Sequence, residues 1–263
     1  MILVTGANGF VGHKIMEMCE DTVASPSLRN LTQEDVDRII GESDADVIVH
    51  TAAVSDIGEC QANPDASYYA NVQIPLFIAK ASKGRKLICF SSDQVYGGCT
   101  EEGPYPEDVV KPANIYAGHK LEMEQRVLEI NPGAVMLRAE WMYDYWLKKS
   151  NYFMNIIGEK EVVSFSSRQF RGITYLKEVA ENMEKVIALP GGVYNFGSET
   201  TKSMYEITRH LLEILGKKVK LEDAPARHNL WMNCDKAKKY GVKFSDVIDG
   251  FIQCAVDYGF IQR

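Results

Sequence analysis

The feature that most constrains this sequence is a glycine-rich turn near its start. The apolar run Ile2 to Thr5 leads directly into residues 6–12, which read GANGFVG, and an amphipathic segment follows from about Phe10 to Cys19. Between a strand and a helix, glycines let the backbone approach a pyrophosphate, whose charge meets the free N–H groups and the dipole of the helix. This context predicts a nucleotide-binding turn. The residues expected to contact the nucleotide are Gly6, Asn8, Gly9, Phe10, Val11 and Gly12.

Short apolar runs alternate with amphipathic segments along the chain, which is the pattern of βα units in a parallel sheet. After the first unit, we expect buried strands at 46–50, 86–91 and 134–138, and helices opened by Thr32, near Pro64 and over 115–130. Residues 97–114 are rich in Gly, Pro and acidic residues and should form a long loop. The predicted fold class is therefore α/β, with a Rossmann-type doubly wound parallel sheet.

The second half of the chain predicts a smaller lobe. Beyond about Ser150 the expected strands shorten, to 162–165, 193–196 and 219–222, and they alternate with helices expected at 176–189, 204–215 and 244–259. We expect residues 1–150 to form the dinucleotide-binding domain, with room for later returns of the chain to it. Residues 151–263 should form a smaller C-terminal α/β lobe that binds the substrate.

Composition and charge argue against several classes of function. With 29 Lys plus Arg against 36 Asp plus Glu, the net charge of -7 would repel the phosphates of a nucleic acid. No apolar run reaches the roughly 18 residues of a membrane helix, so we expect neither nucleic acid nor a membrane as a partner. The six cysteines are isolated and lack zinc-ligand spacing, which predicts reduced thiols and no metal. A first strand that starts at Met1 leaves no room for a cleavable signal, so a cytoplasmic protein is expected.

The segment after the second expected strand bears on the choice of cofactor. An acidic residue that binds the adenosine ribose is usual about 20 residues after the glycine turn, but no Asp or Glu follows Asp21 within residues 22–29. Ser25 and Arg29 stand there instead, and an arginine can fork onto the oxygens of a 2′-phosphate. We therefore expect NADP rather than NAD. A surface loop with incidental polarity is the alternative interpretation, and it leaves NAD open.

Tyr116 and Lys120 are four residues apart on an expected helix, so both side chains project from one face. A cation beside a phenol lowers the pKa of the phenol from about 10 toward a value useful for proton transfer. By itself this Y-x-x-x-K spacing also occurs on ordinary solvated helix faces. Its position after the glycine turn, and after Ser92 at the end of a central strand, favours a catalytic role for all three residues.

This order of motifs resembles the extended short-chain dehydrogenase/reductase family across essentially the whole chain. Within that family, the motifs are most similar to those of the dTDP-4-dehydrorhamnose reductases. The segments that carry the similarity are 4–9 (VTGANG), 91–97 (SSDQVYG), 116–122 (YAGHKLE), 137–143 (LRAEWMY) and 227–230 (RHNL). The resemblance implies NADP or NAD as cofactor and a sugar nucleotide bound between two lobes, and it allows a homodimer.

The resemblance also implies roles for individual residues. In a hydride transfer from the nicotinamide to a 4-keto sugar carbon, Tyr116 would give the proton, Lys120 would hold the nicotinamide ribose, and Ser92 would bond the carbonyl oxygen. Backbone groups of Thr51, Ala52 and Ala53 would line the cofactor. The residues expected on the substrate side are Asp93, Trp141, Arg171 and Arg227, the two arginines as partners of a diphosphate. Core packing is the competing interpretation for Trp141, and an ordinary surface or interlobe position is the competing one for each arginine.

One departure from the pattern and two other functions stay open. Ala139-Glu140 stands where these reductases usually carry a Thr-Ser pair, and Glu140 is expected to place a negative charge near the substrate pocket. A dehydratase is disfavoured because Gln94 follows Asp93 and cannot exchange a proton. A sugar-nucleotide epimerase remains an alternative. So does a non-catalytic NADP-binding subunit, because the regulatory β subunit of methionine adenosyltransferase resembles these reductases.

Overall fold

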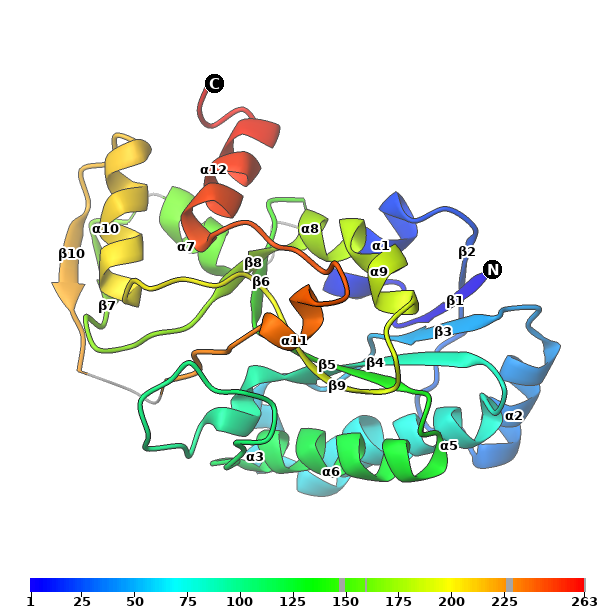
Figure 1. The fold of residues 1–263 in the computed structure, drawn as a ribbon. Coiled ribbons are helices and arrows are strands. Elements are labelled where there is room, and N and C mark those ends of the chain that lie inside the picture. The colour runs from blue at the N-terminus through cyan, green and yellow to red at the C-terminus, as the bar shows by residue number, and fades with distance from the viewer. Residues whose placement is uncertain (147–149, 159, 226–228, 263) are drawn as a thin grey trace.

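A six-stranded parallel sheet forms the centre of the computed structural model, which describes residues 1–146, 150–158, 160–225 and 229–262 (Figure 1). The strand order is β2-β1-β3-β4-β5-β9, and every neighbouring pair is parallel. The strands are β1 (Ile2–Thr5), β2 (Thr22–Ala24), β3 (Val47–His50), β4 (Lys86–Ser92), β5 (Val135–Ala139) and β9 (Gly192–Phe196). Because β2 and β3 lie on opposite sides of β1, the strand order reverses at β1, and ligands of such sheets bind beyond the carboxyl ends of the strands at this point.

Helices cover both faces of the sheet (Figure 1). One face packs against α1 (Phe10–Met18), α8 (Leu176–Glu181) and α9 (Met183–Ile187), and the other packs against α2 (Gln33–Glu42), α5 (Ile74–Ala81) and α6 (Ile115–Ile130). Successive strand residues point to opposite faces, so Leu3 belongs to the core under α2 and α5 while Val4 belongs to the core under α1 and α8. The doubly wound α/β architecture predicted from the sequence is confirmed.

Local sequence signals account for several helix starts. Thr32 caps α2 and forms a reciprocal capping box with Asp35, as the sequence indicates. The helix expected from Pro64 is instead three consecutive segments: α4 (Pro64–Tyr68), a π-helical turn (Tyr69–Gln73) and α5. α3 (Ile57–Ala62) precedes them, and a 3-10 turn (Asp93–Tyr96) follows β4. The π turn carries Asn71, whose side chain bonds both backbone groups of Val54 and so fixes the loop after β3.

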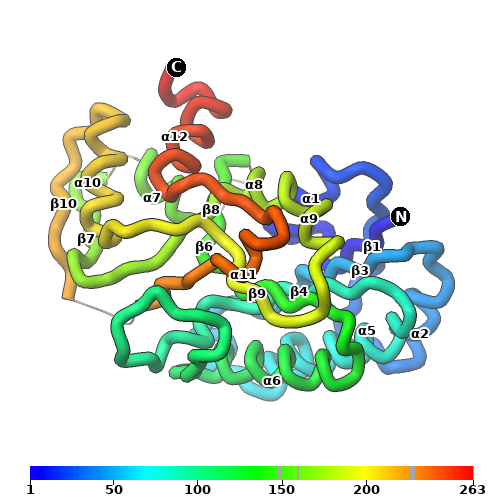
Figure 2. Tube along the Cα trace, in the orientation of Figure 1, coloured from blue at the N-terminus to red at the C-terminus, as the bar shows by residue number. Residues whose placement is uncertain are grey.

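The second lobe is built around two small parallel sheets and their own apolar core (Figure 2). One sheet pairs β6 (Trp141–Tyr143) with β8 (Ile173–Tyr175), and the other pairs β7 (Val162–Phe165) with β10 (Lys220–Asp223). The helices α7 (Tyr152–Ile157), α10 (Met204–Ile214) and α12 (Val247–Asp257) contribute Phe153, Leu211 and Phe251 to the core. The short helix α11 (Asp235–Lys238) lies against β9.

The strand at 193–196 was expected in this second lobe, and that expectation is wrong. β9 pairs with β5, with Leu137 opposite Tyr194, and so closes one edge of the central sheet. The chain therefore returns to the first lobe after leaving it, and α8 and α9 pack on the central sheet on the way. A short apolar run has the same pattern in either sheet, so only the long-range pairing decides where it lies.

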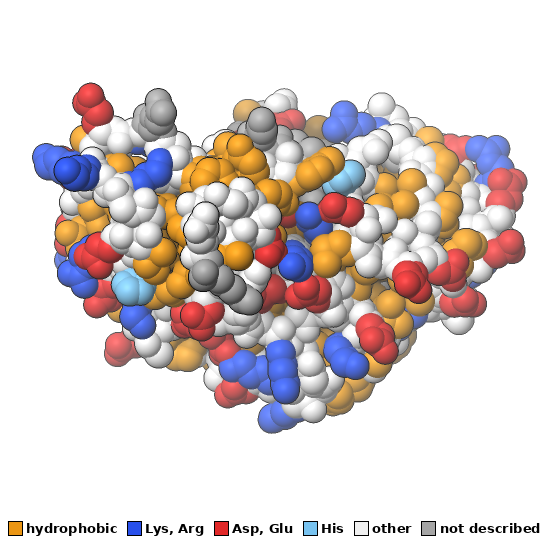
Figure 3. Space-filling model, turned by 90° about the horizontal axis from the view of Figure 1, so that it is seen from above, with side chains coloured by type: hydrophobic (Ala, Val, Ile, Leu, Met, Phe, Trp, Pro, Cys, Tyr) orange, Lys and Arg blue, Asp and Glu red, His pale blue; other side chains and the backbone are white. Residues whose placement is uncertain are grey.

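The surface of the described residues is mixed in charge. Seen from above, basic and acidic side chains are interspersed over the visible face (Figure 3). In the described part of the chain, no helix combines the length and the apolar character that crossing a bilayer requires. Nor does that part bring together three or more His, Cys, Asp or Glu side chains in a way that could hold a metal ion.

Candidate active site

The glycine turn after β1 is packed too closely for side chains. Gly6 has a φ of 75°, which L side chains rarely adopt, and a Cβ there would lie 2.8 Å from the backbone nitrogen of Ala52. A Cβ on Gly12 would lie 2.3 Å from the carbonyl oxygen of Gly6. Thr51 closes the turn from the β3 side, because its hydroxyl donates to the carbonyl oxygen of Thr5 at 2.8 Å. Thr51 and Ala52 thus lie against the glycine turn and Ala53 is exposed beside them, while their contact with a cofactor stays a prediction.

The N-terminus of α1 fits a negatively charged ligand. Gly9 is the N-cap residue, and it offers no side-chain cap to the first N–H groups of the helix. These N–H groups, on Phe10, Val11 and Gly12, have no hydrogen-bond partner within the helix, because no helical turn precedes them. Asn8, just before the N-cap, is exposed, Phe10 and Val11 are half-buried, and Gly9 has no Cβ to cover the helix end. A diphosphate is the ligand for which such a terminus is suited.

Ser25 and Arg29 lie beyond the carboxyl end of β2. The backbone N–H of Ser25 bonds the carbonyl oxygen of Val4, so this residue is next to the end of β1 and close to the glycine turn. Arg29 is exposed, and its backbone N–H bonds the hydroxyl of Ser27. The nearest acidic residue in this segment, Asp21, lies before β2 and therefore at the opposite end of the strand. Ser25 and Arg29 thus both follow β2, and their contact with a 2′-phosphate stays a prediction.

Ser92, Tyr116 and Lys120 come together at the carboxyl end of β4. Ser92 is the last residue of β4, and Asn114 caps α6 so that Tyr116 and Lys120 lie in its first two turns. The hydroxyl of Ser92 donates to Oδ1 of Asp93 at 3.2 Å and is close enough to the Tyr116 hydroxyl to influence its pKa. The ammonium of Lys120 donates to the carbonyl oxygen of Phe90 at 2.8 Å and lies 5.9 Å from the centre of the Tyr116 ring. One residue of β4 and two residues of α6 thus form one cluster.

Burial dominates the electrostatics of this cluster. It raises the pKa of Tyr116, and the charge of Asp93 acts in the same direction, while the hydroxyl of Ser92 opposes them. Burial also lowers the pKa of Lys120 to about 8. The expectation that Lys120 lowers the pKa of Tyr116 is therefore wrong in this structure, because the ammonium bonds the backbone instead of the phenol. Tyr116 is a phenol that keeps its proton, and this suits a proton donor better than a base.

A second buried network, which the sequence does not reveal, holds α6 against the sheet. Glu124 of α6 accepts hydrogen bonds from Ser91 at 2.5 Å and from Arg138 of β5 at 2.7 Å. Arg138 also donates to the hydroxyl of Tyr96, which in turn donates to Asn195 of β9. The only sign of this network in the sequence is Arg138, a single charged residue after the apolar residues of β5. Because Glu124 lies one turn beyond Lys120, the network sets the position of the face of α6 that carries Tyr116 and Lys120.

Asp93, Arg171 and Trp141 form a stack beside Ser92. The guanidinium of Arg171 pairs with the carboxylate of Asp93 at 2.5 Å and lies 3.8 Å from the centre of the Trp141 ring. Arg171 is only 2% exposed, whereas Trp141 is 47% exposed. The expectation that Arg171 pairs with a diphosphate is therefore not met, because Asp93 already neutralises it inside the protein. Arg227, the other arginine predicted for that role, lies outside the described residues.

Glu140, which the sequence predicts to be a negative charge near the substrate pocket, is in surroundings that disfavour its charged form. This residue is buried between β5 and β6, and burial raises the pKa of its carboxyl group well above the usual value. The charge of Asp93 adds to this effect, and the hydrogen bond from Thr174 opposes it. A buried carboxyl group without a direct cationic partner favours its neutral form.

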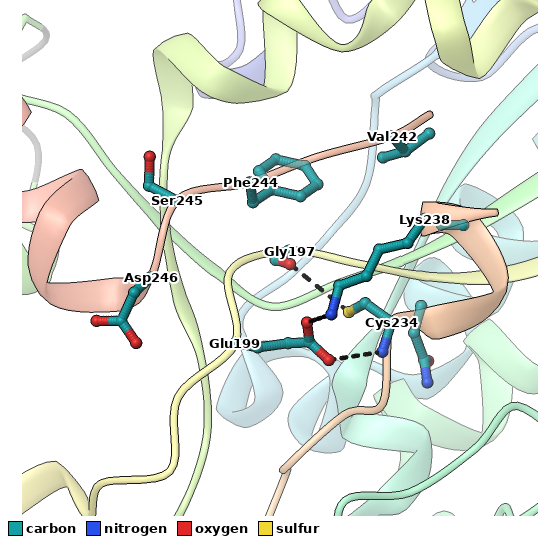
Figure 4. Close-up of a pocket in the computed structure, with 10 residues that line it drawn as sticks. Gly197, Glu199, Cys234, Lys238, Val242, Phe244, Ser245 and Asp246 are labelled. Atoms are coloured by element: carbon teal, nitrogen blue, oxygen red, sulfur yellow. Dashed lines mark hydrogen bonds and ion pairs between the residues drawn. The ribbon is translucent and has the colours of Figure 1, made fainter. Parts of the chain in front are cut away.

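A cavity of about 250 Å³ lies apart from these residues, at the carboxyl end of β9 (Figure 4). Glu199 points into it, pairs with Lys238 of α11 and accepts a hydrogen bond from the backbone of Cys234. None of the site residues predicted from the sequence lines this cavity. Burial raises the pKa of the Cys234 thiol, which disfavours the reactive thiolate.

Comparison with known proteins shows the family to which this chain belongs. A family model described as the RmlD substrate binding domain matches residues 1–230. The chain is 25% identical over 243 residues to a dTDP-4-dehydrorhamnose reductase of Aggregatibacter actinomycetemcomitans, covering 85% of this chain and 82% of that protein. It is 30% identical over 280 residues to the methionine adenosyltransferase 2 subunit beta of Xenopus tropicalis, covering 91% and 82%.

A solved structure shares the fold over nearly the full length. The dTDP-4-dehydrorhamnose reductase from Bacillus anthracis, solved in complex with NADP, superimposes with a TM-score of 0.86 at 22% sequence identity. The match covers 97% of each chain. Together with the matched family model, which spans most of the sequence, this leads to one assignment. The chain belongs to the RmlD substrate binding domain family, and the extended short-chain dehydrogenase/reductase resemblance is consistent with it.

Proposed function

We propose that this protein is an NAD(P)H-dependent reductase of a 4-keto sugar nucleotide, with a reaction like that of dTDP-4-dehydrorhamnose reductase. The observation that carries the proposal is the cluster of Ser92, Tyr116 and Lys120 at the carboxyl end of β4. The cluster lies at the same end of the sheet, the carboxyl end of its strands, as the uncapped N-terminus of α1, where a dinucleotide would bind. The reductase relatives support the same assignment.

In the proposed reaction, a bound nicotinamide supplies a hydride to the carbonyl carbon of the sugar. The hydroxyl of Ser92 donates a hydrogen bond to the carbonyl oxygen, on which negative charge develops. Tyr116 then transfers the proton of its hydroxyl to that oxygen, which gives the alcohol and leaves a phenolate. The ammonium of Lys120 lies in the next turn of the same helix, where it would hold the nicotinamide ribose, and a solvent proton then restores the phenol.

The experiment that tests this function measures NADPH and NADH oxidation with a panel of 4-keto sugar nucleotides that differ in nucleotide and sugar. We expect turnover with at least one member and formation of the corresponding 4-hydroxy sugar nucleotide, identified by mass spectrometry. Absence of turnover across the panel, with intact cofactor binding, would reject the reductase. A 4-hydroxy sugar nucleotide that is interconverted without net consumption of the cofactor would identify the epimerase instead.

Cofactor preference gives a separate prediction. NADPH should bind more tightly than NADH, because Ser25 and Arg29 stand where the 2′-phosphate would lie. Arg29→Ala should remove most of the difference, on the order of 1 to 3 kcal/mol for a charge-assisted contact. Arg38→Ala is the matched control, since Arg38 is an exposed arginine that pairs with Asp35 on α2. Calorimetric titration with NADPH and with NADH measures the difference in affinity. Equal affinities in the unmodified protein would contradict the prediction.

A second candidate function is a non-catalytic, NADP-binding regulatory subunit. The observation that favours it is the 30% identity to the subunit beta of a methionine adenosyltransferase, over most of both chains. This candidate predicts tight NADPH binding, no turnover with any panel member, and an effect on the kinetics of an added methionine adenosyltransferase. The buried cluster of Ser92, Tyr116 and Lys120 is the reason to prefer the reductase.

A further inference from the structure

Glu140 lies at the junction where the chain leaves the central sheet for the small sheet of the second lobe. It follows β5 and precedes β6, and only 7% of its surface is exposed. Burial of a carboxyl group at such a junction lowers the stability of the fold unless the surrounding residues provide space and hydrogen bonds for it. The surroundings of Glu140 are built in this way.

Two glycines provide the space for the carboxyl group. A Cβ on Gly172 would lie 2.1 Å from Oε2 of Glu140, and a Cβ on Gly197 would lie 2.5 Å from its Cδ. Neither glycine has the positive φ that would require glycine for backbone reasons. At Gly197 the lack of a side chain is explained by the Glu140 carboxyl group, which takes the room that a Cβ would need. At Gly172 the backbone oxygen of Ser198, 2.0 Å from the position of a Cβ, excludes a side chain as well, and the Glu140 carboxyl group fits against the bare backbone.

A hydrogen-bond chain links Glu140 to both lobes. The hydroxyl of Thr174 in β8 donates to Oε1 of Glu140 at 2.5 Å. The backbone N–H of Ser198, just beyond β9, donates to the same hydroxyl at 2.8 Å. The carboxyl group therefore connects the β5–β6 junction, the small sheet and the end of the central sheet.

The chain neighbours of these groups form the stack next to Ser92. Trp141 follows Glu140, and Arg171 precedes Gly172, so the contact of Glu140 with Gly172 lies directly beside the contact of Trp141 with Arg171. The two segments run parallel, with Trp141 opposite Ile173. Arg171 in turn pairs with Asp93, the residue after Ser92. Displacement of the Glu140 carboxyl group would thus shift Trp141 and Arg171 against each other.

We propose that Glu140 is a positioning residue that holds Trp141 against Arg171, and that through this stack it sets the affinity for the sugar-nucleotide substrate. Its effect on the substrate rests on the proposed reductase function, whereas its effect on Trp141 does not. Glu140 lies away from the glycine turn, so cofactor affinity should not depend on it.

The experiment reads the position of Trp141 directly, by acrylamide quenching of its fluorescence in a Trp146→Phe, Trp231→Phe background. Glu140→Ala should raise the quenching constant, because Trp141 is released from the buried guanidinium. Glu140→Gln keeps the volume and an oxygen that accepts from Thr174, and it should restore the original value. Glu178→Ala is the matched control, because Glu178 of α8 is another buried carboxyl group, and it accepts a hydrogen bond from the backbone N–H of Ser245.

Kinetics of the same variants test the consequence for the substrate. Glu140→Ala should raise the KM for the 4-keto sugar nucleotide on the order of ten-fold or more, with kcat and the Kd for NADPH nearly unchanged. If Glu140→Ala does not fold, Thr174→Val, which removes the hydroxyl that donates to Glu140 and accepts from Ser198, should shift quenching and KM in the same direction.

Unchanged quenching in Glu140→Ala or, failing that, in Thr174→Val overturns the positioning role, as does an equal rise in Glu178→Ala. Unchanged KM with altered quenching overturns the link to the substrate. If the unmodified protein reduces no panel member, the reductase function fails, while the quenching result still decides whether Glu140 positions Trp141.

Discussion

Tyr116→Phe should lower turnover on a 4-keto sugar nucleotide by about 10² to 10⁴-fold, which is the usual contribution of general acid catalysis. The substitution keeps the ring and removes the proton that the developing alkoxide requires. Because burial raises the pKa of Tyr116, the phenol is protonated at neutral pH and is ready to donate. NADPH affinity should stay close to that of the unmodified protein, because the glycine turn and Lys120 are unchanged. Steady-state kinetics and calorimetric titration of the same preparation measure both quantities.

The matched control for this prediction is Tyr152→Phe. Tyr152 is also a buried tyrosine with a hydroxyl partner, Thr208, but it lies in the core of the second lobe. Loss of its hydroxyl should reduce stability slightly and leave turnover unchanged. Full reductase activity in Tyr116→Phe would show that another group delivers the proton, and the assigned mechanism would then be wrong.

Lys120→Met should abolish most activity and, at neutral pH, stabilise the fold. The ammonium is buried, and burial lowers its pKa from 10.5 to about 8. Below pH 8 both the folded and the unfolded chain carry this proton, so the full cost of burying the charge is present, about 3 kcal/mol for a displacement of this size. Between pH 8 and 10.5 the unfolded chain binds more protons than the folded one, so the stability of the unmodified protein rises with pH and the cost disappears.

Urea unfolding of the unmodified protein and of Lys120→Met, at pH 7 and near pH 10, tests the sign of the difference in their stability. Methionine loses the hydrogen bond to Phe90, worth about 1 kcal/mol, so we expect Lys120→Met to be more stable by about 1 to 3 kcal/mol at pH 7. The difference should shrink or reverse near pH 10. NADPH affinity and turnover should both fall, because Lys120 is proposed to serve the ribose as well as Tyr116. A variant that is less stable at pH 7, or that binds NADPH normally, would contradict this view of the buried ammonium.

The parts of this protein that the sequence predicts correctly depend on interactions between near neighbours in the chain. The turn from Gly6 to Gly12, the cap at Thr32 and the Tyr116–Lys120 spacing are properties of short segments, whose conformation follows from φ preferences, capping groups and helical periodicity. The doubly wound sheet follows from the alternation of such segments. These features were sufficient to locate the candidate site.

The tertiary structure alone decided the features that depend on burial and on distant partners. β9 has the same sequence pattern in either lobe, and its pairing with β5 places it in the central sheet. The sequence predicts that Arg171 is a free cation, but the fold brings Asp93 to it. The sequence likewise predicts a charge on Glu140, but the fold buries this residue and burial raises the pKa of its carboxyl group. The pKa of Tyr116 rises although a lysine is near, because desolvation outweighs a cation that bonds elsewhere. The pKa values of Glu140 and Tyr116 are set by the removal of water around these side chains, and that removal depends on chain segments far away in the sequence.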